Sequence, residues 1–254
     1  MPNLGGDYPG RQIFLGGLKS GEPAFAYFVS GRSKKSQERY AAPYDPMERA
    51  VRVRPLDPNE EFDPFRHYQA VRIDPKSGLL LVSNSQAPND MLVEFYTNET
   101  VQENSFRTYM GKVLALAGPE HDNSKNPTPR IAGLVLQNEN ILGIIAAGAT
   151  QSARYYTEYD GKLAFVQTYD GNVNYRALNV FSWWVRLLQE SDAAFFETDQ
   201  TTAHGLADEI FDMSDFESPE YGKLRVCSVA GVRNGNGPGG WDIAVRNRHA
   251  PPAL

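Results

Sequence analysis

The sequence predicts a layered α+β fold, in which antiparallel sheets and helices form separate layers. Strand-like segments come in pairs joined by short turns, and helix-like segments come in blocks between these pairs. Strands joined by a hairpin are antiparallel, and helices that occur in blocks do not supply the regular crossovers of a doubly wound parallel sheet. We therefore expect an α+β sandwich.

The N-terminal part of the chain contains two predicted hairpins and a single strand. RQIFLGGL (11–18) and PAFAYFVSG (23–31) are rich in β-forming residues and enclose a turn-prone KSGE sequence, which indicates a hairpin. Further strands are predicted at 50–55, 67–73 and 78–84. The DPKSG sequence between the last two is typical of a turn, so these strands should form the second hairpin.

Helices and strands then follow one another in blocks. A helix that begins near Asn89 or Asp90 and a helix at 105–118 come first. The remaining predicted elements are strands at 130–136, 141–147 and 162–169, which we expect to form one group, helices at 176–190 and 201–213, and strands at 224–232 and 241–247. The loop NGNGPGG (234–240) contains a GxGxxG pattern, but a strand follows it, so we interpret it as a hairpin loop.

Composition and charge exclude several classes of protein. The chain has 254 residues, of which 41% are apolar and 22% charged, so it can bury a core as one large domain or two small ones. A net charge of −6 argues against a broad surface for nucleic acid. No apolar run is long enough to cross a membrane, and the N-terminus lacks a signal-peptide pattern. We expect a cytoplasmic protein with no nucleic-acid or membrane partner.

Cysteine and histidine give no sign of a metal site. The single cysteine, Cys227, lies in the apolar run LRVCSVAGV, where a buried thiol is expected. The four histidines show no HExxH spacing, and there is no CxxC pair. We therefore expect no metal.

Two segments carry positive charge in positions that suit a small anionic ligand. SGRSKKSQER (30–39) follows a predicted strand directly and combines four cations with three serine hydroxyls, a chemistry that holds phosphate or carboxylate groups. A solvated loop is an equally good interpretation of the same pattern. In the second segment, Pro127 and Pro129 stiffen the approach to Arg130, which is either a positioned side chain or a surface cation.

Six segments together resemble, in order, those of the archaeal-type IMP cyclohydrolase family. They are YPGRQIFLGG (8–17), AYFVSGRSKKSQER (26–39), HYQAVRI (67–73), VSNSQAPND (82–90), PTPRIAGLV (127–135) and QTYDGN (167–172). The resemblance covers about residues 8–175 and implies a single domain with a C-terminal elaboration at 176–254. It also implies a four-layer αββα sandwich like that of the N-terminal-nucleophile hydrolases. The nucleophile is absent, because Asp7 precedes the YPGR segment.

The resemblance further implies a reaction and a set of site residues. The reaction is the ring closure of 5-formamidoimidazole-4-carboxamide ribonucleotide to IMP, the last step of IMP synthesis, and it needs no cofactor because both reacting groups belong to one substrate. The family also implies a homo-oligomer. By resemblance, the catalytic residues are Arg39, Tyr68 and Glu120, and the substrate-binding residues are Arg32, Ser33, Asn84, Arg130, Tyr169 and Asn172. A non-catalytic protein that binds purine nucleotides, or another amidohydrolase on the same fold, remains an alternative.

Overall fold

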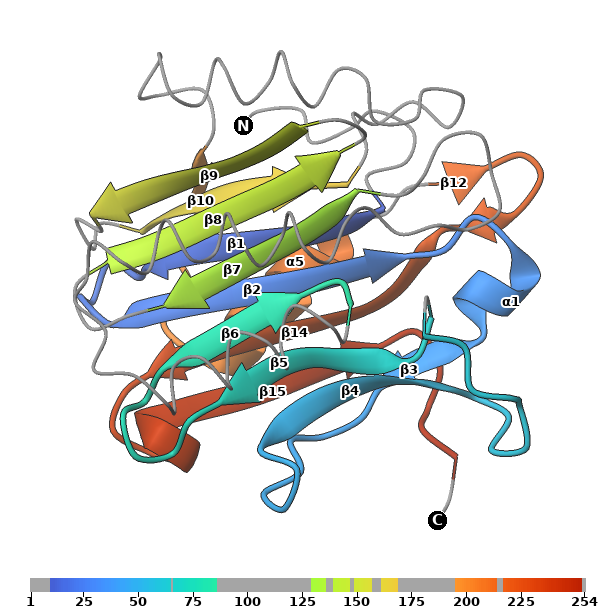
Figure 1. Cartoon of the computed structure of the whole chain (residues 1–254), viewed down its shortest axis with the longest axis horizontal. Coiled ribbons are helices and arrows are strands. Elements are labelled where there is room, and N and C mark those ends of the chain that lie inside the picture. The colour runs from blue at the N-terminus through green and yellow to red at the C-terminus, as the bar shows by residue number, and fades with distance from the viewer. Residues whose placement is uncertain are drawn as a thin grey trace.

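Two antiparallel sheets lie face to face in the computed structural model, and helix α5 (Ala203–Met213) packs on the outer side of one of them (Figure 1). The structure describes residues 10–64, 66–85, 129–135, 139–146, 149–156, 161–168, 195–213 and 217–252. This mixed, strand-rich architecture confirms the α+β class. The helices predicted near residue 89, at 105–118 and at 176–190 lie outside the described residues.

The first sheet has six strands in the order β11-β10-β1-β2-β14-β15. Its strands are β1 (Arg11–Gly17), β2 (Pro23–Ser30), β10 (Lys162–Gln167), β11 (Phe195–Glu197), β14 (Arg225–Arg233) and β15 (Trp241–Asn247). Each neighbouring pair is antiparallel. The predicted hairpin between β1 and β2 is confirmed, and the glycine-rich loop joins β14 to β15 as a hairpin loop.

The second sheet has seven strands in the order β3-β4-β5-β6-β7-β8-β9. Its strands are β3 (Arg39–Ala41), β4 (Ala50–Pro55), β5 (Tyr68–Ile73), β6 (Leu80–Ser83), β7 (Arg130–Val135), β8 (Glu139–Ala146) and β9 (Ala149–Tyr156). The predicted hairpin between β5 and β6 is confirmed. Smaller elements are α1 (Lys34–Gln37), the pair β12 (Glu217–Ser218) and β13 (Gly222–Lys223), and a 3-10 turn, η1 (Pro238–Gly240).

Alternation along the central strands explains why the first sheet is apolar on both faces. Ile13 and Leu15 of β1 belong to the core between the two sheets, whereas Phe14 belongs to a second core under α5, together with Leu206 and Ile210 of that helix. Successive strand residues point to opposite faces, so a strand covered on both sides must be apolar throughout. The apolar runs at 13–17 in β1 and 23–29 in β2 follow from this double burial.

One predicted grouping of strands is wrong. We expected 162–169 to join 130–136 and 141–147 as their third strand, but β10 pairs with β1 in the other sheet. The place beside β8 is taken by β9, whose sequence ATQSARYY is too polar to have been recognised as a strand. Local sequence indicates a strand, but its partner depends on how distant segments pack.

Part of the C-terminal segment completes the first sheet. β14 pairs with β2 along most of its length, and β15 pairs with β14. The sheet therefore combines strands from both ends of the chain, while the domain boundaries given above stay a prediction. Among the described residues, no helix has the length and apolarity needed to cross a membrane.

Candidate active site

One end of the first sheet carries polar residues at three adjacent strands. The antiparallel register brings together the start of β1, the end of β2 and the end of β10. The Arg11 amide donates to Thr168 Oγ1 at 3.0 Å, and Ser30 Oγ donates to the Gly10 carbonyl oxygen at 2.7 Å. The Arg11, Ser30 and Thr168 side chains are all buried at this end of the sheet.

The facing end of the second sheet is also polar. β6 runs antiparallel to both β5 and β7, so Asn84, just past the end of β6, lies near the first residues of those strands, Tyr68 and Arg130. Tyr68 and Asn84 are buried, and Arg130 is half-buried. Three residues that sequence reasoning assigned to the site therefore belong to one end of this sheet.

A pair of tyrosine hydroxyls joins the two polar ends. Tyr27 Oη of β2 lies 2.7 Å from Tyr68 Oη of β5, and the two residues are 0% and 1% exposed. Burial raises the pKa of the Tyr27 hydroxyl well above its ordinary value, the neighbouring Tyr68 raises it further, and the Arg11 charge opposes the rise. Tyr27 is therefore a neutral hydroxyl throughout the physiological pH range.

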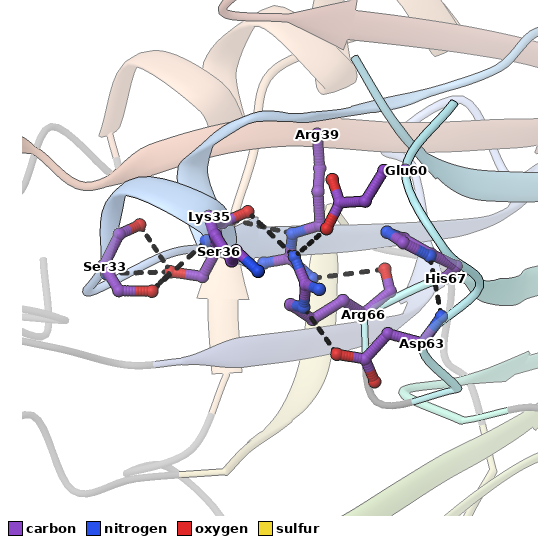
Figure 2. Close-up of polar contacts among 8 residues, drawn as sticks. All are labelled: Ser33, Lys35, Ser36, Arg39, Glu60, Asp63, Arg66 and His67. Carbon is purple, nitrogen blue, oxygen red and sulfur yellow. Dashed lines mark hydrogen bonds and ion pairs between the residues drawn. The ribbon is translucent and has the colours of Figure 1, made fainter. Parts of the chain in front are cut away.

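Arg39 is buried at the start of β3 and binds main-chain carbonyl groups from three segments. Its Nε donates to Ser36 O at 2.7 Å, its Nη1 to Arg66 O at 3.4 Å, and its Nη2 to Ser30 O at 3.5 Å. Figure 2 shows this guanidinium beside α1 and the segment before β5. Arg39 thus joins three segments: the basic loop, the end of β2 and the residues just before β5.

A cluster of charged residues lies in the segment just before β5. Arg66 forms ion pairs of 2.6 Å with Glu60 and with Asp63, and His67 Nδ1 accepts a hydrogen bond of 3.0 Å from the Asp63 amide (Figure 2). Burial lowers the pKa of His67, and the neighbouring Arg66 charge lowers it further. A pocket of about 280 Å³ lies beside this cluster, and its lining includes Arg54, Phe62 and His67.

The basic loop folds into the short helix α1. Ser33 is its N-cap: Ser33 Oγ accepts from the Ser36 amide at 3.2 Å, and Ser36 Oγ accepts from the Ser33 amide at 2.8 Å. Ser33 is exposed and Arg32 is half-buried. The serine hydroxyls of this loop thus stabilise the start of the helix, a role that the charge pattern alone did not predict.

Asn84 holds two strands together. Its Oδ1 accepts from the Ile131 amide and its Nδ2 donates to the Pro129 carbonyl oxygen, both at 2.9 Å. The side-chain amide therefore extends the hydrogen bonding between the end of β6 and the start of β7. This contact fixes Arg130, which lies between the two bonded residues in the sequence.

The structure brings some of the predicted site residues together. Tyr68 pairs with Val53 of β4, and Val53 pairs with Ala41, two residues beyond Arg39, so Arg39 and Tyr68 lie two strands apart on one sheet. Glu120, Tyr169 and Asn172 lie outside the described residues. Tyr169 directly follows Thr168 in the sequence. The roles assigned to all nine residues stay predictions.

Sequence reasoning missed two buried polar residues of this end, Arg11 and Tyr27. Arg11 has the same strand parity as Ile13 and Leu15, which face the core between the sheets. A charged residue on the buried face of an apolar strand is the signal that could have found it. Tyr27 gives no such signal, because a tyrosine in an apolar strand is commonplace.

Two further observations concern metals and the thiol. Among the residues that the structure describes, no group of three His, Cys, Asp or Glu side chains is placed to hold a metal ion. Cys227 is fully buried, as predicted, and burial raises the pKa of its thiol to about 12 against the opposing effect of the Arg39 charge.

Comparison with known proteins agrees with the resemblance found in the motifs. Residues 8–237 match the family model described as IMP cyclohydrolase-like protein. The chain belongs to this family. It is also 27% identical, over 227 residues, to a protein of Methanocaldococcus jannaschii named IMP cyclohydrolase, and the alignment covers 89% of this chain and 96% of that relative. The IMP cyclohydrolase-like match extends past residue 175, so it includes β11, α5 and β14.

Proposed function

We propose that this protein is an IMP cyclohydrolase, which converts 5-formamidoimidazole-4-carboxamide ribonucleotide to IMP and water. The observation that carries the proposal is the family match over residues 8–237. The buried polar end supports it, because Arg39 and Tyr68, two residues implied by the motifs, lie on one sheet near that end. A relative that bears the name of this activity aligns over 89% of the chain.

The reaction consists of an attack followed by a dehydration. The carboxamide nitrogen attacks the formyl carbon, a C–N bond forms, and the formyl oxygen becomes a hydroxyl group as the nitrogen loses one proton. The C–O bond then breaks, the formamido nitrogen loses its proton as a C=N bond forms, and the hydroxyl group leaves as water. Both reacting groups belong to one molecule, so the protein has to orient them, stabilise charge on oxygen and move two protons.

The proposed residues divide this work. Tyr68 donates a hydrogen bond to the formyl oxygen while negative charge develops there, and Glu120 carries protons from the two reacting nitrogens to the departing hydroxyl group. Arg39 supplies positive charge at this end and orders the segments around it. Arg32 and Ser33 bind the phosphate, and Arg130, Asn84, Tyr169 and Asn172 line the rest of the pocket.

The finer structural predictions belong to the same proposal. We infer a single domain whose fourth layer completes an αββα sandwich like that of the N-terminal-nucleophile hydrolases, without the nucleophile. Support comes from the two facing sheets and from α5, which packs on the outer side of one of them. A homo-oligomer in the cytoplasm, acting without a cofactor, completes the proposal.

Incubation of the purified protein with the formamido ribonucleotide tests the activity, since IMP formation can be followed by its absorbance. We expect turnover. Saturable binding without IMP would favour a non-catalytic nucleotide-binding protein, and neither binding nor turnover would discard the purine hypothesis.

Three substitutions test the assigned residues. We expect Tyr68→Phe and Glu120→Gln each to lower kcat by about 100-fold or more, the usual contribution of a positioned acid or base. Arg39→Ala should also lower turnover. Wild-type rates in all three variants would show that the catalytic set is wrong.

A further inference from the structure

We propose that Tyr27 is a positioning residue for the reaction: its hydroxyl donates a hydrogen bond to Tyr68 Oη and thereby leaves the Tyr68 proton for the substrate. This inference rests on the proposed function, because it assumes that Tyr68 contacts the reacting formyl group. Its evidence is separate, however, and comes from the buried contact between the two sheets.

The geometry places the two hydroxyls in direct contact. Tyr27 lies on β2 and Tyr68 on β5, and both belong to the core between the sheets. Their oxygens are 2.7 Å apart, the usual distance of an O–H···O bond. The same core contains apolar side chains from both sheets, including Val29 and Val82.

Burial, together with the proposed contact between Tyr68 and the formyl group, decides which hydroxyl donates. Within the described part of the chain, the hydrogen bond to Tyr68 Oη is the one that the structure shows for the Tyr27 hydroxyl. If Tyr68 donated to Tyr27, the Tyr27 proton would be buried without a described partner, which is costly. If Tyr27 donates, its proton is used and the Tyr68 proton is free to bind the formyl oxygen. With substrate bound, the second arrangement satisfies both hydroxyls.

This direction also suits the chemistry. As the Tyr68 proton is drawn toward the developing oxyanion, negative charge grows on Tyr68 Oη, and a hydrogen bond donated by Tyr27 stabilises that charge in a dry core. Arg11 adds positive charge on the same side, as its effect on Tyr27 indicates. Tyr27 itself gives up no proton and touches no reacting atom, so it acts through Tyr68.

Tyr27→Phe removes only the oxygen and provides the first test. We expect kcat to fall about tenfold, the effect of one hydrogen bond, while KM changes less than about twofold. In a Tyr68→Phe background, Tyr27→Phe should change kcat by less than about twofold, because its partner is already gone. Wild-type kcat in Tyr27→Phe, or multiplicative effects in the double variant, would overturn the proposal.

Tyr40→Phe is the matched control. Tyr40 is a mostly buried tyrosine on β3, with 6% of its surface exposed. The same chemical change at this buried tyrosine should leave kcat and KM unchanged. A loss equal to that of Tyr27→Phe would mean that removal of a tyrosine oxygen elsewhere in the fold disturbs the site equally, which would contradict a specific role for Tyr27.

A proton NMR measurement separates this inference from the proposed function. The slowly exchanging hydroxyl proton between the two oxygens should show its strongest cross-peaks to the Tyr27 ring in the nucleotide-bound protein, and it should vanish in Tyr27→Phe. Strongest cross-peaks to the Tyr68 ring would refute the bond direction even if turnover is normal. A protein that makes no IMP but shows the expected proton would instead refute the proposed function.

Discussion

At the residue scale, the buried polar side chains of this protein fasten segments that are distant in the sequence. Asn84 and Arg39 are the clearest cases, since each bonds main-chain groups of other segments. Motifs predicted both as site residues. Their structural contacts could not be predicted, because Asn84 binds the main chain at Ile131, 47 positions away.

The first residue-scale prediction concerns Asn84. Asn84→Asp removes the donor and places a carboxylate against the Pro129 carbonyl oxygen in a fully buried site. The free energy of unfolding, measured in urea, should fall by about 2 kcal/mol or more. The control is Asn236→Asp at an exposed position, which should change stability little. Equal stabilities of the two variants would contradict the structural role.

The second residue-scale prediction concerns pH. The pKa of His67 is lowered in the folded protein by burial and the Arg66 charge, so below its ordinary value of 6.5 the unfolded chain takes up a proton that the folded protein does not. The stability that His67 contributes in its neutral form is therefore fully present above pH 6.5. It is lost as the pH falls from 6.5 toward the lower pKa that His67 has in the folded protein.

Replacement of His67 should reduce this pH dependence. In His67→Asn, the side-chain oxygen can still accept from the Asp63 amide but does not titrate. The loss of unfolding free energy between about pH 7.5 and about pH 5 should be smaller in this variant than in the wild type. His204→Asn, at an exposed position on α5, is the control and should match the wild type. If His67→Asn loses as much unfolding free energy over this pH range as the wild type does, His67 is not the group responsible.

At the element scale, two turns from different sheets close one edge of the sandwich. The loop between β14 and β15 packs on the turn between β5 and β6, where Trp241 Nε1 donates to the Gly78 carbonyl oxygen at 2.9 Å. The Trp241 ring also packs edge-on against Phe25, with centroids 5.6 Å apart. Both turns were predictable from glycine and proline, but their contact joins segments 163 positions apart and has no local signal.

Gly78 tests this contact. Gly78 has φ +71°, and a Cβ there would lie 2.4 Å from an Arg233 nitrogen and 2.7 Å from the Gly239 carbonyl oxygen. Gly21 has φ +97° with nothing within 4 Å. Gly21→Ala should therefore cost only the backbone strain of about 1 to 2 kcal/mol, while Gly78→Ala should cost at least about 1 kcal/mol more, because it also displaces packed groups. Denaturant unfolding compares the two, and equal costs would contradict the packing.

At the scale of the whole molecule, the two sheets enclose one core that is apolar along most of its length and polar at one end. Alternation and turn residues were enough to predict most of the described strands and α5. They were not enough to assign β10 to its sheet or to bring Tyr27 to Tyr68, because both depend on how the sheets pack. The motifs identified the family, and the structure added the polar contacts around two of the predicted catalytic residues.

The central claim is that substrate binds and reacts at the polar end where Arg11, Tyr27 and Tyr68 meet. A crystal structure of the protein with IMP bound measures this directly. We predict that the purine base lies at this end, within hydrogen-bond distance of the Tyr68 hydroxyl. IMP bound at another place on the protein, with no contact to Tyr68, would contradict the claim.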